Sequence, residues 1–147
     1  GFRMSNNFRL EKAGIDEIST FLAADFPQMP VDIISVGNCK ARVRHIVTEA
    51  DLRPGGTISG PCMMGLADVT IYIALLGEIG IVPLAVTTNL NVSFLKKPQA
   101  DKNLIAECNL LKLGRTLAVG EVYIYSEGEE DKAVCHVVGT YAIPPRV

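Results

Sequence analysis

The sequence lacks any excess of basic residues. Its 14 Lys and Arg residues are outnumbered by 16 Asp and Glu residues, which gives a formal net charge of −2 at pH 7. Proteins that bind nucleic acid through its phosphates carry a clustered positive charge. We therefore expect no nucleic-acid partner.

Motifs that would indicate a metal, a cofactor or a serine nucleophile are also missing. The four cysteines, Cys39, Cys62, Cys108 and Cys135, include no C-x-x-C pair, and no metal-ligand spacing occurs. There is no phosphate-binding loop or dinucleotide fingerprint, and residues 56–60 read GTISG rather than G-x-S-x-G. We expect no metal and no cofactor, and we expect buried cysteines in a reducing, cytoplasmic compartment.

Secretory and membrane segments are not expected either. The first residues, GFRMSNN, contain no apolar stretch typical of a signal peptide. The apolar run from Ile58 to Leu76 is nearly long enough to span a bilayer. Asp68, the one charge near its middle, would cost about 2.5–3.5 kcal/mol on insertion, and Gly60 and Pro61 weaken the case further. The run therefore predicts a buried helix of a soluble domain, without a membrane partner.

The chain contains enough apolar residues for one core. It has 147 residues, 48% of them hydrophobic, and shows no internal repeat, linker or low-complexity tract. We expect residues 1–147 to form a single domain.

Helix and strand patterns alternate along the first third of the chain. Residues 15–26 place apolar side chains at helical spacing, and Pro27 ends that pattern. Residues 31–36 read as a strand, Gly37 and Asn38 as a two-residue turn, and residues 39–48 as a second strand. This pattern predicts a short helix followed by a hairpin.

The rest of the chain predicts one long helix and four strands. The segment from 60 to about 79 is too long for a strand, and it is apolar nearly all round, so the helix should be buried on most sides. Four strand-like runs follow with short separators, which favours a four-strand antiparallel meander. These runs cover residues 84–96, 103–113, 116–126 and 133–143.

Together the elements predict an α+β hot-dog architecture. A helix that is apolar all round requires a curved sheet, here of about six antiparallel strands, wrapped around it. The short amphipathic helix at 15–26 would pack over another part of the fold. Such a sheet leaves its edges open and one side of the helix uncovered, and pairing with a second copy relieves both. We expect a homodimer or homotetramer.

Asp68 and Gly60 are the two residues of this helix that suggest chemistry. An isolated carboxylate in an apolar helix needs partners or a function, and a structural carboxylate bonded to Thr70, Tyr72 or a loop N–H is the alternative. Gly60 lets a ligand approach a helix N-terminus, which suits a carbonyl oxygen that gains negative charge; a plain helix cap is the alternative.

The spacing of these two residues limits how they can cooperate. Eight residues separate them, which is about 12 Å along one helix axis. One reacting carbonyl therefore cannot touch both on the same helix. If they act together, Gly60 of one chain must meet Asp68 of another.

Three further features of the sequence have a functional and a structural interpretation. One face of the strand at 84–96 is polar, so that Thr87 could orient water, with a plain solvent-facing side as the alternative. That face comprises Ala85, Thr87, Asn89, Asn91 and Ser93. His45 and His136 fall in strands and are expected to be core or edge histidines far from the helix start. Cys62 is expected to serve packing.

Four stretches in sequence order resemble PaaI-like acyl-CoA thioesterases of the hot-dog superfamily. They are RPGGTISGPCMMGLADVTIY, AVTTNLNVSFLKKP, LLKLGRTLAVGEVYIYSEG and VGTYAI. The resemblance covers roughly residues 33–143. It implies hydrolysis of an acyl-CoA thioester to a free acid and CoA, with coenzyme A as part of the substrate rather than a cofactor.

The resemblance also implies roles for single residues. The glycine whose N–H polarises the thioester carbonyl falls on Gly60, and the acid that serves as general base or nucleophile from the opposite subunit falls on Asp68. The hydroxyl that positions the acid or the water falls on Thr87. Ser59 and Pro61 stand where the family has a His and a second Gly. A non-catalytic acyl-CoA-binding module is the alternative, and a dehydratase is less favoured because it requires a histidine at this site.

Further residues are expected to contact the substrate. They are Ser59, Met64, Asn89, Lys112 and Arg115. Lys112 and Arg115, with Lys96 and Lys97, are candidates for the CoA phosphates. The identity of the acyl group stays open.

Overall fold

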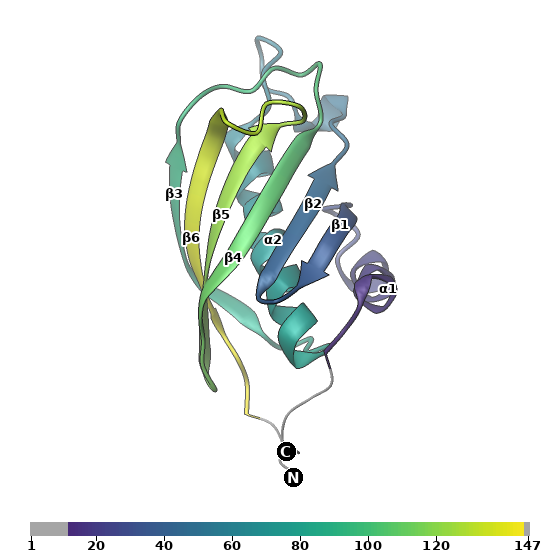
Figure 1. Cartoon of the computed structure of the whole chain (residues 1–147). Coiled ribbons are helices and arrows are strands. Elements are labelled where there is room, and N and C mark those ends of the chain that lie inside the picture. Colours follow the sequence, from purple (N-terminus) through teal and green to yellow (C-terminus); the bar gives the residue numbers. More distant parts are fainter. Residues whose placement is uncertain (1–11, 146–147) are drawn as a thin grey trace.

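The computed structural model describes residues 12–145 (Figure 1). The expectation of no signal peptide concerns residues 1–7, which lie outside the described part. Two α-helices, one 3₁₀ helix and six strands follow one another along the described residues. In order they are α1 (Ile15–Asp25), β1 (Asp32–Gly37), β2 (Lys40–His45), η1 (Glu49–Asp51), α2 (Gly60–Ile79), β3 (Val86–Phe94), β4 (Leu104–Leu113), β5 (Leu117–Ser126) and β6 (Ala133–Ala142).

The six strands form one antiparallel sheet around α2, which is the predicted hot-dog fold (Figure 1). The strand order is β1-β2-β4-β5-β6-β3, so β1 and β3 form the two edges. α2 contacts all six strands from one side of the sheet, and α1 packs against β1 and α2.

The predicted four-strand meander is wrong in one strand. β4, β5 and β6 are joined by short turns, but β3 pairs with β6 at the sheet edge, because the other side of β4 is occupied by β2. Residues 95–103 therefore cross from the edge to the sheet centre instead of turning tightly. This crossing lies against the loop before α2, where the Ile58 N–H donates to the Pro98 carbonyl at 3.1 Å and Thr57 pairs with Gln99.

α2 is long and apolar enough to cross a membrane, but most of it is buried inside the fold, as in a core helix. The sheet lies close to it at a pair of glycines, Gly120 on β5 and Gly139 on β6, which face each other in the ladder. A Cβ at Gly139 would lie 2.7 Å from Ile71 Cδ1, and one at Gly120 would lie 3.0 Å from Ile71 Cγ2. The absence of both side chains makes room for Ile71 of α2.

The β1–β2 turn differs by one residue from the prediction. It consists of Asn38 and Cys39, whose φ angles of 54° and 62° are the positive values that a tight primed turn requires. The Cys39 N–H donates to Glu78 at 2.9 Å, and Glu78 also pairs with Lys12 at 3.5 Å. Glu78 is buried and Asp68 only half-buried, so Asp68 is not the sole buried charge of α2.

Candidate active site

The first turn of α2 is capped by a serine and leaves one backbone donor uncommitted. Ser59 Oγ accepts the Cys62 N–H at 3.2 Å, and the Met63 N–H donates to the Ser59 carbonyl. Pro61 has no N–H. Among residues 12–145, the Gly60 N–H has no hydrogen-bond acceptor, so it is free to meet a ligand at the positive end of the helix dipole.

A groove of about 450 Å³ lies beside this donor. Phe94 packs over Gly60 so closely that a Cβ there would lie 3.2 Å from the ring. Three cationic side chains, Arg53, Lys96 and Lys97, line the same groove. The full lining is Arg53, Thr57, Ile58, Gly60, Pro61, Met63, Phe94, Leu95, Lys96 and Lys97. The groove therefore combines a free N–H with positive charge.

Asp68 lies two turns further along α2, and two hydroxyl groups hold it. The Thr87 hydroxyl donates to Asp68 Oδ1 at 2.7 Å, and the Tyr141 hydroxyl donates to the same oxygen at 2.8 Å. Among the described residues no donor reaches Oδ2. The carboxylate is therefore oriented through one oxygen while the other stays available.

The structural partners considered for Asp68 from the sequence are engaged elsewhere. The Thr70 hydroxyl donates to the Leu66 carbonyl at 2.6 Å, and the Tyr72 hydroxyl donates to the Val82 carbonyl at 2.9 Å. The contact with Thr87 is the one that the family resemblance had implied. Its catalytic role stays a prediction.

Tyr141 is the site residue that sequence reasoning missed. It is buried on β6, directly opposite Thr87 in the β3–β6 ladder, and its ring stacks on Tyr72 at 5.5 Å. Burial raises the pKa of its hydroxyl, and the neighbouring Asp68 charge raises it further, so the hydroxyl stays a donor at neutral pH. The predicted meander places β4 beside β3, whereas β6, which carries Tyr141, is the actual neighbour of β3. Knowledge of this pairing would have indicated Tyr141.

A bulge in β3 changes which residues share a face. The ladder register shifts between Thr87 and Asn89, so Thr88 is an extra residue. Thr87 therefore lies on the helix side together with Leu90 and Val92, which pack against the core. The expectation that Thr87 and Asn89 share one face is wrong, and Asn89 is exposed on the other side.

α2 has one uncovered side, as predicted, and the candidate residues lie along it. Gly60, Met64 and Asp68 are spaced by four residues and therefore share one helix face. Gly60 and Asp68 are half-buried and Met64 is exposed, whereas most of the later helix is buried. Gly60 lines the groove and Asp68 does not, so the two stay apart within one chain.

Lys112 and Arg115 are not brought to this site in the single chain. Both are exposed, at the end of β4 and in the β4–β5 turn. The C-terminal end of α2 contacts Cys39 through Glu78, and the Leu110 N–H donates to the Cys39 carbonyl at 2.8 Å. The β4–β5 turn therefore lies beyond the end of α2 opposite to Gly60 (Figure 1).

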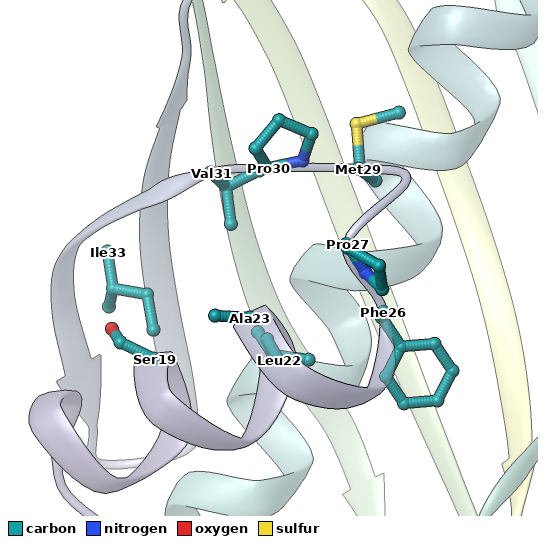
Figure 2. A pocket seen from close by; sticks show the side chains of 9 residues that line it. All are labelled: Ser19, Leu22, Ala23, Phe26, Pro27, Met29, Pro30, Val31 and Ile33. Atoms are coloured by element: carbon teal, nitrogen blue, oxygen red, sulfur yellow. The ribbon is translucent and has the colours of Figure 1, made fainter.

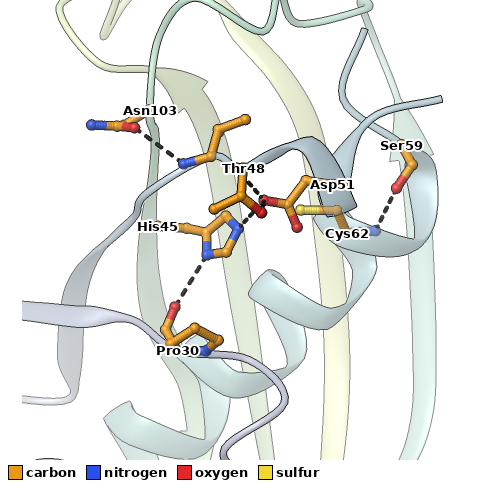
Figure 3. Close-up of polar contacts among 8 residues, drawn as sticks. Pro30, His45, Thr48, Asp51, Ser59, Cys62 and Asn103 are labelled. Atoms are coloured by element: carbon orange, nitrogen blue, oxygen red, sulfur yellow. Dashed lines mark hydrogen bonds and ion pairs between the residues drawn. The ribbon is translucent and has the colours of Figure 1, made fainter. Parts of the chain in front are cut away.

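His45 is closer to the helix start than predicted. Its Nε2 lies 2.9 Å from Asp51 Oδ2 (Figure 3). The Asp51 carbonyl in turn accepts the N–H of Ser59 at 2.8 Å. This contact could not be predicted from the sequence, because the loop at 49–57 has no periodic pattern that would place Asp51. His136, in contrast, lies on β6 and pairs with Glu121 at 2.8 Å.

A second hollow, of about 230 Å³, lies between α1 and the segment that leads into β1 (Figure 2). None of the candidate site residues lines it. Its lining is mostly apolar and comprises Ser19, Leu22, Ala23, Phe26, Pro27, Met29, Pro30, Val31 and Ile33. The groove at Gly60 is therefore the better candidate for a polar substrate.

Comparisons with known proteins agree with this fold. The family model of the thioesterase superfamily matches residues 55–133. A crystal structure of a candidate thioesterase from Silicibacter is 42% identical, covers 92% of this chain and 96% of its own, and superposes with a TM-score of 0.82. No curated protein sequence matches the chain.

Two more distant structures share the fold. The PaaI protein of the E. coli phenylacetic acid degradation operon is 21% identical, with 88% of this chain and 92% of its own covered and a TM-score of 0.75. A Streptococcus mutans protein bound to acetyl-CoA is 18% identical, with 79% and 90% covered and a TM-score of 0.69.

Proposed function

Because the chain belongs to the thioesterase superfamily, we propose that it hydrolyses an acyl-CoA thioester to a free acid and CoA. The observation that carries the proposal is the Asp68 carboxylate, which Thr87 and Tyr141 hold through Oδ1 alone. The fold neighbour that binds acetyl-CoA supports CoA thioesters as the substrate class.

The reaction assigns one task to each group. The Gly60 N–H would bind the carbonyl oxygen as it becomes negative, which is worth about 2.7–4 kcal/mol for oxyanion donors elsewhere. Asp68 would take a proton from water while the water oxygen bonds to the carbonyl carbon, or it would attack that carbon itself. In the first route the carbon–sulfur bond then breaks, and the CoA sulfur takes that proton. In the second route the same bond breaks as an anhydride forms between Asp68 and the acyl group; water then cleaves the anhydride, which releases the acid, restores the carboxylate and supplies the proton for the sulfur. Thr87 would keep the carboxylate in place.

A complete site requires two copies of the chain. Gly60 and Asp68 are separated by about 12 Å along α2, so one carbonyl cannot reach both in one chain. The uncovered side of α2 and the edge strand β3 offer a surface for a second copy. Large exposed apolar side chains gather there: Met64, Leu84, Val86, Phe94 and Leu95. We propose a homodimer in which Gly60 of one copy meets Asp68 of the other.

The positive groove suggests where the CoA phosphates bind. Arg53, Lys96 and Lys97 line the same groove as Gly60 and suit a phosphate group. Ser59 is occupied as the helix cap, so its contribution is to shape the turn. Lys112 and Arg115 lie too far from Gly60 of their own chain and could serve only a site that another copy completes.

A thiol-release assay over short, medium, long and aryl CoA esters tests the proposal. We expect turnover of at least one ester by the wild-type protein, and loss of turnover in Asp68→Asn with an unchanged circular dichroism spectrum. Asp16→Asn, an exposed carboxylate of α1, is the matched control and should leave the rate unchanged. Unchanged hydrolysis in Asp68→Asn would remove this carboxylate from the mechanism.

The same panel separates hydrolysis from binding alone. Ser59 and Pro61, which replace the family's His and second Gly, are the observation that favours a non-catalytic acyl-CoA-binding module. Tight binding by calorimetry without thiol release from any ester would establish that alternative. Sedimentation of a stable monomer at micromolar concentration would contradict the shared site.

A further inference from the structure

A buried polar cluster lies next to the first turn of α2 and outside the groove (Figure 3). His45, at the end of β2, is only 3% exposed. Its Nδ1 lies 3.1 Å from the Pro30 carbonyl oxygen and its Nε2 lies 2.9 Å from Asp51 Oδ2. Because a carbonyl oxygen can only accept, Nδ1 carries a hydrogen, and Nε2 faces the Asp51 carboxylate.

Asp51 collects donors from both sides of the cluster. The Thr48 N–H donates to its Oδ2 at 2.9 Å, and a carboxylate oxygen of Asp51 lies within 4.8 Å of the Cys62 Sγ. Burial favours the neutral acid, but the hydrogen bonds from Thr48 and His45 outweigh it, so the pKa of Asp51 is lowered. Asp51, the last residue of η1, thus bonds to His45 of β2 and lies beside Cys62 of α2.

The same residue holds both flanks of Gly60. The Asp51 carbonyl accepts the Ser59 N–H at 2.8 Å, one residue before Gly60. The Asp51 carboxylate lies within 4.8 Å of the Cys62 Sγ, two residues after Gly60, and the Cys62 N–H donates to Ser59 Oγ. The position of Gly60 between these two residues therefore depends on where Asp51 lies.

His45 links Asp51 to the sheet. η1 has only three residues and is closed locally by the capping box between Thr48 and Asp51. The imidazole connects Asp51 to the Pro30 carbonyl and to β2, which is an inner strand of the sheet. The sheet therefore positions the helix start through one buried side chain.

We propose that His45 and Asp51 are positioning residues that aim the Gly60 N–H at the substrate carbonyl. The consequence for hydrolysis rests on the proposed function, whereas the clamp on the helix start does not. An oxyanion donor acts only when it lies 2.7–3.1 Å from the developing charge, and a misplacement of 1 Å can cost about 100-fold in rate. A loosened clamp should therefore lower kcat more than it changes KM.

A metal ion is the alternative occupant of this cluster. One ligand atom from each of His45, Asp51 and Cys62 lies within 4.8 Å of the others. Metal-binding histidines also donate their second N–H to a backbone carbonyl, as His45 does to Pro30. Hydrogen bonds already engage His45 and Asp51 in this cluster. Burial raises the pKa of the Cys62 thiol to about 12, which favours the neutral thiol over the thiolate that a metal requires.

The kinetic test compares variants of one residue. Asp51→Ala should lower kcat by roughly 10–100-fold with KM within about twofold of wild type. Asp51→Asn keeps an acceptor of the same shape and should recover a large part of the rate. Glu49→Ala, an exposed residue of the same 3₁₀ helix, is the control and should leave both constants unchanged. A rise in KM with unchanged kcat would overturn the positioning role.

Amide hydrogen exchange tests the clamp without any substrate. In Asp51→Ala, the Cys62 N–H should lose protection while the Ile71 and Ile73 amides in the middle of α2 keep theirs. Unchanged protection at Cys62, or equal loss along the whole helix, would overturn the clamp even if the wild-type protein hydrolyses no acyl-CoA. Thermal unfolding with added zinc tests whether a metal ion occupies the cluster. If zinc raises the melting temperature of the wild type but not that of Asp51→Ala, the cluster is a metal site and the hydrogen-bonded clamp is overturned.

Discussion

Thr87 and Tyr141 face each other across the β3–β6 ladder, and both donate a hydrogen bond to the same carboxylate oxygen, Asp68 Oδ1. Directly paired residues of neighbouring strands point to the same face of a sheet, which explains why both hydroxyls reach one atom of α2. The bulge at Thr88 lies immediately after this pair and shifts the alternation, so that Leu90 instead of Asn89 lies on the same side as Thr87. The two strands thus hold one carboxylate between them.

Removing the Tyr141 hydroxyl should slow turnover while the protein stays folded. Tyr141→Phe keeps the stacking on Tyr72 and deletes one hydrogen bond to a charged group, a contact worth about 1.5–3 kcal/mol. If that energy is expressed in the orientation of Asp68, kcat should fall roughly 10–100-fold. Steady-state kinetics on the best ester of the panel measures it.

Tyr72→Phe is the matched control for this variant. It also deletes a buried tyrosine hydroxyl of the stacked pair, but that hydroxyl donates to the Val82 carbonyl and not to Asp68. We expect Tyr72→Phe to lower the melting temperature without the loss of kcat. Equal kinetic effects in both variants would mean that Tyr141 acts through packing alone.

The glycine pair beneath α2 predicts a steric effect on stability. A Cβ at position 139 would lie 2.7 Å from Ile71 Cδ1 and 2.7 Å from Leu90 Cδ2. Gly139→Ala should therefore destabilise the fold by about 1–3 kcal/mol, the range found for overpacked cores. Urea unfolding of the purified protein measures this difference.

A double-mutant cycle shows whether Ile71 is the cause. Ile71→Val removes the Cδ1 atom that a new methyl group would meet, so the double variant should be less destabilised than the sum of its single variants. Additive free energies would contradict a clash between residues 71 and 139 and assign the effect to Leu90 or the backbone.

The sequence predicted the elements of the fold because their patterns are long. The apolar run of α2 and the alternation in the later strands persist over ten residues or more, and Pro61 and Gly80 mark the helix ends. The placement of β3 was wrong, because its pairing with β6, from Phe94 with Cys135 to Val86 with Ala142, joins residues far apart in the chain and leaves no local trace in the sequence. The turn lies at Asn38 and Cys39, one residue later than the predicted Gly37 and Asn38. These two residues take the positive φ angles of the primed turn, which a cysteine does not signal in a sequence.

The candidate site was predictable only in part for the same reason. Gly60 and Asp68 stand out locally, as a glycine at a helix start and a charge in an apolar run. Tyr141 and the pair of His45 and Asp51 reach the site by strand pairing and loop packing. Neither relationship has a spacing that one sequence can reveal, and both became visible only once the three-dimensional contacts were known.

Three of the four cysteines should resist alkylation in the folded protein. Burial raises the pKa of the Cys62 and Cys108 thiols to about 12 and that of Cys135 to about 11, so little thiolate exists at pH 8. Cys39 is half-buried in the β1–β2 turn and provides the internal comparison. Mass spectrometry after iodoacetamide treatment should find label on Cys39 first; prior labelling of Cys108 would contradict its burial.

The lowered pKa of Asp51 predicts how its contribution to stability changes with acid. The unfolded carboxyl has a pKa near 3.9, and the folded value lies lower, because the hydrogen bonds from Thr48 and His45 outweigh burial. The folded protein therefore holds this proton more weakly than the unfolded chain, and the contribution is present above about pH 4 and is lost as the pH falls through the folded pKa. The difference in melting temperature between wild type and Asp51→Asn should stay level from about pH 6 to 5 and shrink towards pH 3. Glu49→Gln should show no such change, and a difference that widens on acidification would show that Asp51 is not held as a carboxylate.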